Sequence, residues 1–181
     1  VSGQWIVVMR APPEPIDYRD LVLARQAVGA QRESDAMKVQ KLGHAVVKVR
    51  NLERSEEFYH GLLGIPIAAR HETMPMTFFP LGDHHDLALL EVGTESPDAD
   101  KQSPGLFHLA FRVGNDIHDL RAAKEELEAA GIKVYATIDH TVSKALYLDD
   151  PDGNGIELYV DGSDVWQSDP QRVADGVPLD L

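Results

Sequence analysis

The sequence predicts an α+β fold made of two copies of one strand–helix–strand–strand–strand module. The first observation is an internal repeat, in which LGHAVVKVRN aligns with LFHLAFRVGN so that His44 matches His108 and Asn51 matches Asn115. The second is that the repeat stays nearly in phase, because Glu91 and Glu157 lie in the last strands of the two halves. The third is that each half passes from strand-like alternation to helical spacing of its apolar residues.

The first module is expected over residues 41–93. Alternation over 42–51 predicts a half-buried strand with His44, Val46 and Lys48 on one face. The following LERSEEFYHGLLG segment has helical apolar spacing, and Asn51 is a suitable N-cap. Further strands follow, and the last of them, ALLEV, contains Glu91.

The second module is expected over residues 105–161. A strand near 106–115 leads into a helix capped by Asn115 or Asp116 and closed by Gly131. The last two strands are joined by DPDGN, a strong turn sequence. In the final strand, GIELYVD, Glu157 and Tyr159 face one way while Ile156, Leu158 and Val160 face the sheet's covering helix. Each helix is expected on the outer face of a curled mixed sheet.

The residues before and after the two modules differ from them in composition. Residues 1–38 are expected to be an N-terminal extension, residues 39–161 the functional domain and residues 162–181 a C-terminal tail. The 181 residues include no cysteine, which excludes disulfides, thiolate metal sites and cysteine nucleophiles. A net charge of −13 disfavours nucleic acid and anionic membranes as partners. With no signal-peptide pattern and no apolar run of roughly 18 residues, a cytoplasmic protein is expected.

The repeat and the motifs LGHAVVKVRNLERSEEFYHGLLGI and ALYLDDPDGNGIELYVD resemble the vicinal oxygen chelate superfamily. This superfamily includes glyoxalase I, extradiol ring-cleaving dioxygenases, and bleomycin- and fosfomycin-resistance proteins. The resemblance covers residues 41–161 and is greatest to members like catechol 2,3-dioxygenase. It implies two βαβββ modules packed around a cleft that holds a divalent metal. Because a fold does not fix the chemistry, the site residues decide between the activities.

Three residues match the metal ligands of the extradiol members: His44, His108 and Glu157. Two imidazoles and one carboxylate form the facial triad of non-haem Fe(II) oxygenases, which leaves open positions for substrate and O₂. A carboxylate inside the apolar GIELYV strand is costly to bury without a partner, which favours a ligand role for Glu157. The resemblance therefore implies Fe(II), with Mn, Zn or Ni as alternatives, a catechol-like aromatic substrate, O₂ as co-substrate and a homodimer.

Three further residues are candidates for catalysis. His85, in HHDLALL, takes the position of the acid/base histidine in the extradiol members, a role that suits the pKa of imidazole. Tyr147 takes the position of the tyrosine that contacts substrate, where a phenol donates to a developing negative charge. His140 lies two residues beyond the position of a second active-site histidine, where this chain has Ile138. For each residue the alternative is a structural side chain.

Two other functions fit the same family. A glyoxalase-I-like lyase or isomerase would use Glu91 as a fourth ligand with His44, His108 and Glu157, around Zn²⁺ or Ni²⁺. A metal-free binding protein of the resistance type would need none of these ligands. The presence of His85 and Tyr147 favours the dioxygenase.

Overall fold

The computed structural model of the protein describes residues 39–98 and 100–181. The chain divides into two units, residues 1–42 and 43–181, and every helix and strand named below lies in the second. The expected N-terminal extension, residues 1–38, lies outside the described residues. No helix in the described part of the chain has the length and apolar character needed to cross a bilayer.

The first module has the element order that the repeat predicts. Strand β1 (Ala45–Val49) leads into helix α2 (Leu52–Glu56), which continues as the π-helical turn η1 (Glu57–Leu62). The next three strands are β2 (Ala69–Arg70), β3 (Met76–Phe79) and β4 (Leu87–Glu91). The sheet order is β1-β4-β3-β2, with β1 parallel to β4 and the other pairs antiparallel, so β1 is an edge strand.

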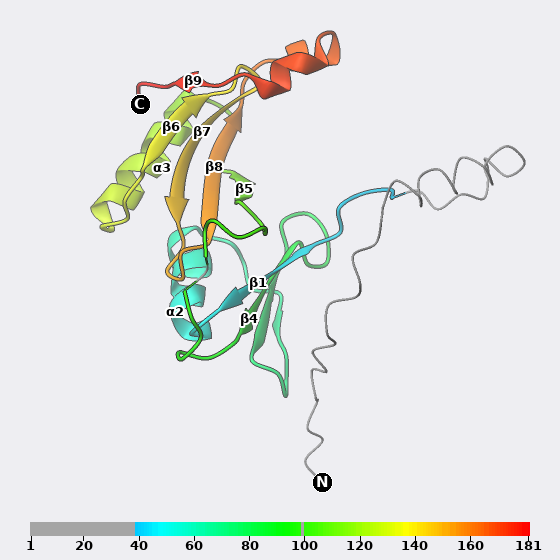
Figure 1. Cartoon of the computed structure of the whole chain (residues 1–181), viewed down its shortest axis with the longest axis vertical. Coiled ribbons are helices and arrows are strands. Elements are labelled where there is room, and N and C mark those ends of the chain that lie inside the picture. Colours follow the sequence, from blue (N-terminus) through cyan, green and yellow to red (C-terminus); the bar gives the residue numbers. More distant parts are fainter. Residues whose placement is uncertain (1–38, 99) are drawn as a thin grey trace, which may run out of the picture. The chain divides into compact units, whose positions relative to one another are not determined.

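The second module repeats this arrangement. Its elements are β5 (Leu109–Arg112), α3 (Ile117–Ala129), β6 (Ala136–Asp139), β7 (Ser143–Asp149) and β8 (Gly155–Asp161). The sheet order is β5-β8-β7-β6-β9, where β9 (Val177–Pro178) comes from the C-terminal residues. Helix α3 covers one face of this sheet, against β7 and β8 (Figure 1). The predicted α+β fold of two βαβββ modules is confirmed.

Local sequence signals set the helix starts. The Asn51 side chain accepts a hydrogen bond from the Arg54 N–H at 2.8 Å, as expected for an N-cap. Of the two candidates for the second cap, Asp116 is the one used. Its side chain accepts from the first turn of α3 while the Asp119 side chain accepts from the Asp116 N–H, which completes a capping box.

A single apolar core joins the two modules. Strand residues that face the helices are fully buried, including Val49 in β1 and Ile156 in β8, while Leu120 is the buried anchor of α3. Tyr59 of the first module is buried with its ring against Phe79 and against Phe111 of the second module. Burial of these side chains removes apolar surface from water and supplies the main stabilisation of the fold.

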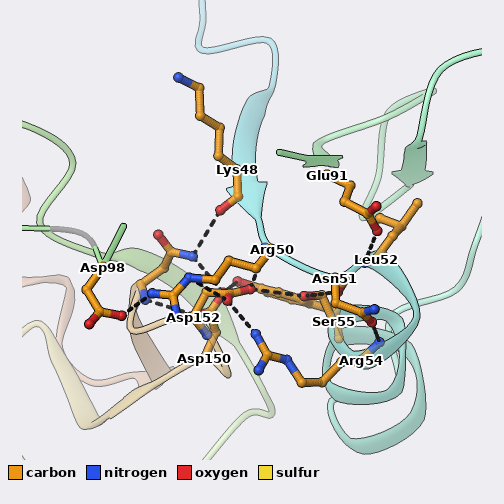
Figure 2. Close-up of polar contacts among 12 residues, drawn as sticks. Lys48, Arg50, Asn51, Leu52, Arg54, Ser55, Glu91, Asp98, Asp150 and Asp152 are labelled. Carbon is orange, nitrogen blue, oxygen red and sulfur yellow. Dashed lines mark hydrogen bonds and ion pairs between the residues drawn. The ribbon is translucent and has the colours of Figure 1, made fainter. Parts of the chain in front are cut away.

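Polar contacts also join the modules, at the β7–β8 turn. Asp152 in this turn accepts a hydrogen bond from the Arg50 N–H at 3.1 Å and forms an ion pair with Arg54 (Figure 2). Its side chain is 5% exposed. The Tyr59 hydroxyl donates to the buried Asp150 carboxylate at 2.9 Å. These contacts fix the start of α2 against the DPDGN turn.

The residues after β8, expected as a tail, form local structure on the second sheet. Two 3₁₀ helices, η2 (Asp164–Gln167) and η3 (Pro170–Ala174), precede β9. Strand β9 pairs antiparallel with β6, and the Leu179 N–H donates to the Thr137 carbonyl at 3.0 Å. This arrangement brings Asp175 next to the loop between β6 and β7.

Candidate metal centre and its neighbours

Two of the predicted ligands lie together on the second sheet. His108, directly before β5, and Glu157, in β8, have their Nε2 and Oε2 atoms 2.9 Å apart. Strands β5 and β8 are parallel neighbours, with Ala110 opposite Glu157, so the two side chains share one face. Glu157 is buried within β8. An imidazole and a carboxylate converge here as they do at divalent metal sites.

A glycine allows this close approach. A Cβ atom at Gly155 would lie 2.4 Å from the Phe107 carbonyl oxygen and 3.2 Å from the His108 Cβ. The backbone contact at Phe107 cannot be relieved by rotating a side chain. Gly155 therefore lets β8 begin directly beside His108.

Tyr147 borders this pair. It lies directly opposite Glu157 in the β7–β8 register, and its ring is 5.6 Å from the His108 ring. Burial is the main cause that raises the pKa of Tyr147 to about 12, and the charge of Glu157 and a hydrogen bond with it act in the same direction. The phenol therefore keeps its proton at neutral pH and remains a hydrogen-bond donor.

His140 holds the Tyr147 hydroxyl from the other side, with Nε2 and Oη 2.8 Å apart. Its second ring nitrogen, Nδ1, lies 2.7 Å from the Asp175 carbonyl oxygen. Because a carbonyl only accepts, Nδ1 carries a proton, and Nε2 accepts a hydrogen bond from the Tyr147 hydroxyl. The adjacent Thr141 has φ 68°, unusual for a β-branched residue, and its hydroxyl donates to the Asp175 carboxylate at 2.9 Å.

The remaining predicted residues lie on the first sheet. His44 is exposed and lies directly before β1. Its ring centroid is 4.4 Å from that of His85, which lies two residues before β4. The Nδ1 atoms of His84 and His85 are 2.5 Å apart. The His85 ring also packs edge-on against the ring of Phe78. His44 and His85 thus form one imidazole group beside an aromatic side chain.

The six predicted site residues therefore form two groups. His108, Glu157, Tyr147 and His140 belong to the second module, whereas His44 and His85 belong to the first. Across residues 39–98 and 100–181, no three histidine, aspartate or glutamate side chains come together as a metal site. The chemistry of the donors fits a divalent metal, and the His108–Glu157 pair supplies two of the three ligands in one place.

Glu91, the candidate fourth ligand, has another partner. Its Oε2 accepts a hydrogen bond from the Leu52 N–H at 2.7 Å, at the first residue of α2 (Figure 2). A carboxylate in this position satisfies one of the N–H groups that a helix start leaves without an intrahelical partner. This structural role accounts for Glu91 without a metal.

The sequence did not indicate the contribution of Asp175 to the site. The contact to His140 is made by the main-chain carbonyl, so no side-chain motif marks it. The acidic and proline residues of 162–181 resemble those of a surface tail, and only the β6–β9 pairing brings them to the site.

Comparison with known proteins identifies the family. Residues 41–158 match the family model described as the Glyoxalase/Bleomycin resistance protein/Dioxygenase superfamily. The chain is 36% identical over 133 residues to the catechol-2,3-dioxygenase of Bacillus subtilis, which covers 71% of this chain and 44% of that protein. It is 30% identical to biphenyl-2,3-diol 1,2-dioxygenase 2 of Rhodococcus globerulus, covering 67% of this chain and 63% of that one.

The chain thus spans about half the length of these two relatives. Among solved structures, it is similar to a glyoxylase/bleomycin resistance protein/dioxygenase domain from Frankia sp. EAN1pec. The TM-score is 0.58 at 25% identity, over 68% of this chain and 99% of that domain. These matches confirm the resemblance seen in the sequence motifs. The two βαβββ modules, the paired His108 and Glu157 and the matching family model agree, and the chain belongs to the Glyoxalase/Bleomycin resistance protein/Dioxygenase superfamily.

Proposed function

We propose that this chain is an Fe(II)-dependent extradiol-type dioxygenase that opens a catechol-like aromatic ring with O₂. The observation that carries the proposal is the Tyr147 phenol, held by His140 and placed beside the His108–Glu157 pair. A protonated phenol next to a metal-binding carboxylate suits a substrate whose oxygens carry negative charge. The catechol and biphenyl-diol dioxygenases among the relatives support the same substrate class.

In this proposal His44, His108 and Glu157 hold the metal, and Fe²⁺ bound there would supply the redox chemistry that joins a catecholate to O₂. The Tyr147 O–H turns from Nε2 of His140 toward a substrate oxygen and donates to it. His140 holds the phenol beside the site until then, since its own Nδ1–H is anchored on the Asp175 carbonyl. His85, next to His44 and Phe78, exchanges a proton with the reacting oxygens.

The glyoxalase-like alternative is less well supported by the site. It needs Glu91 as a metal ligand, and this carboxylate is bonded to the start of α2. It also leaves Tyr147 and His140 without a role in the proton transfer.

Oxygen uptake with catechols, after anaerobic loading of the full chain with Fe²⁺, tests the proposal. We expect uptake with the appearance of a yellow ring-opened product, and a large loss of turnover in His85→Ala and Tyr147→Phe. His118→Ala, on the exposed surface of α3, is the matched control and should retain wild-type turnover. Isomerisation of a methylglyoxal–thiol adduct by Zn²⁺- or Ni²⁺-loaded protein, without oxygen uptake by the iron form, would overturn the proposal.

A further inference from the structure

A cavity of about 450 Å³ lies at the junction of the two modules, away from the candidate metal centre. None of the six predicted site residues lines it. Leu158 lines it from β8, and because successive strand residues point to opposite faces, the cavity and Glu157 lie on opposite faces of the second sheet. Small-molecule sites in proteins have volumes of about 300–1,000 Å³. The cavity is therefore a candidate binding site of its own, separated from the metal centre by the sheet.

Both modules contribute walls to the cavity. Residues 62–66 and Leu81 come from the first module, and residues of β5 and α3 come from the second. The first of these segments begins at the end of the π-helical turn η1, where the Leu63 N–H donates to the Phe58 carbonyl at 2.9 Å. Such π-helical turns are rare and occur frequently at functional sites. A ligand in the cavity would contact both modules at once.

Most of the lining side chains are aliphatic, and several of them are in contact with solvent. Leu81 is 51% exposed, and Val113, directly after β5, is 36% exposed. Phe111 in β5 adds an aromatic side chain that is only partly buried. A ligand that covers this surface gains free energy roughly in proportion to the apolar area removed from water. The lining therefore favours a ligand with an apolar body.

Three charged residues line the cavity, and one of them has no partner. The Arg112 guanidinium forms an ion pair with Asp161 at 3.1 Å. The Asp119 carboxylate accepts N–H groups at the start of α3, as part of the capping box. In contrast, the Glu126 carboxylate has no hydrogen-bond or ion-pair partner in the part of the chain that the structure describes. Because the chain also has a net charge of −13, a cation is the favoured partner for this carboxylate.

We propose that this cavity binds a small organic amine, with its ammonium group beside Glu126 and its apolar body against Leu81, Phe111 and Val113. The ligand binds the folded chain alone, because its site exists only where the two modules meet, and it therefore stabilises the fold by mass action. The site needs neither a metal nor O₂, so this inference does not depend on the proposed dioxygenase activity.

Three compounds that share one apolar body test the preference for a cation. They are 4-phenylbutylamine, 4-phenylbutan-1-ol and 4-phenylbutyrate, and isothermal titration calorimetry with the full-length chain gives their affinities. We expect the amine to bind most tightly and the carboxylate least tightly, and the amine to raise Tm as its concentration rises. Equal affinities, tightest binding of the carboxylate, or no binding of any compound would overturn the proposal.

A substitution that fills the cavity tests its location. Ala122 lines the cavity from an exposed position of α3, so Ala122→Phe should fold and bind the amine at least tenfold more weakly. Ala129→Phe is the matched control, since Ala129 is also exposed on α3 and does not line the cavity, and it should keep the wild-type affinity. Wild-type affinity in Ala122→Phe would place the amine elsewhere on the chain and overturn the proposal.

A substitution that removes one charge tests the role of the carboxylate. Glu126→Gln should weaken binding of 4-phenylbutylamine about fivefold, close to the upper value for a solvent-exposed ion pair, and leave binding of the alcohol unchanged. Glu125→Gln, on the exposed surface of α3 and outside the cavity, removes the same charge and should bind the amine as the wild type does. Equal losses in the two variants would show an effect of overall charge and would contradict an ammonium site at Glu126.

Discussion

Tyr147 lies directly opposite Glu157 across the β7–β8 pair, and its hydroxyl is 2.8 Å from Nε2 of His140. A phenol is thus placed between the proposed metal-binding carboxylate and an imidazole that is anchored by the Asp175 carbonyl. This arrangement allows the contribution of the Tyr147 hydroxyl to turnover to be measured separately from that of its ring.

Replacement of Tyr147 by phenylalanine keeps the ring and removes the hydroxyl. Because one donor to a developing oxyanion is lost, we expect kcat for a catechol to fall by about a hundredfold. Metal content should not change. Tyr135→Phe is the control, since Tyr135 is 51% exposed and its ring centroid is 6.5 Å from that of Tyr147. Equal turnover in the two variants would remove Tyr147 from the mechanism.

His140→Ala tests whether the imidazole acts through Tyr147. We expect a slower enzyme than the wild type, and a Tyr147→Phe/His140→Ala double variant no slower than Tyr147→Phe alone. The effects of substitutions within one hydrogen-bonded network are non-additive in this way. Steady-state kcat values for the four proteins measure the coupling, and strictly multiplicative losses would show that His140 acts independently.

Gly155→Ala should disturb the metal site through the backbone. The added Cβ meets the Phe107 carbonyl at 2.4 Å, so β5 must shift and carry His108 away from Glu157. We expect an overpacking cost of about 1–3 kcal/mol in the free energy of unfolding and a weaker affinity for Co²⁺. Gly61→Ala, where a Cβ meets nothing within 4 Å, should leave both unchanged.

Two aspartates that pair with Arg50 should differ in their contribution to stability. Asp152 has a side chain that is 5% exposed, whereas that of Asp98 is 89% exposed. Asp152→Ala leaves the Arg50 N–H without its acceptor, and we expect a loss of about 2 kcal/mol. Asp98→Ala removes only a solvated ion pair and should cost less than about 0.5 kcal/mol. Urea unfolding of the two variants gives both values, and similar losses would contradict the proposed link.

The buried Tyr59–Asp150 hydrogen bond predicts a pH dependence. Burial, and then the charge of Asp150, raises the pKa of Tyr59 above its usual value of about 10. The contribution to stability is therefore complete below about pH 10, the pKa in the unfolded chain, and is lost as the pH rises further. Urea unfolding of wild type and Tyr59→Phe between pH 7 and 11 should show a steeper loss above pH 10 in the wild type. Parallel profiles would contradict this linkage.

Part of the arrangement of the candidate site could be predicted because strand alternation is a local property. The GIELYV pattern identified Glu157 as a polar residue in a buried strand, and the register of β7 brought Tyr147 opposite to it. The Asn51 cap could likewise be predicted, and the second cap was limited to Asn115 or Asp116, since a cap depends on neighbouring residues only. The hydrogen bond from the Leu52 N–H to Glu91 could not be predicted from the sequence, because it joins residues 39 positions apart.

The alignment of His44 with His108 and the family could be established from the sequence alone, because internal repeats and motifs are properties of the linear chain. The tertiary structure alone decided which of the matched residues meet. His108 reaches Glu157 because β5 and β8 are adjacent strands, and Asp175 reaches His140 because β9 pairs with β6. His44 lies beside His85 because the strands that follow them, β1 and β4, are adjacent in the first sheet. The spacing of residues along a chain does not specify such long-range packing.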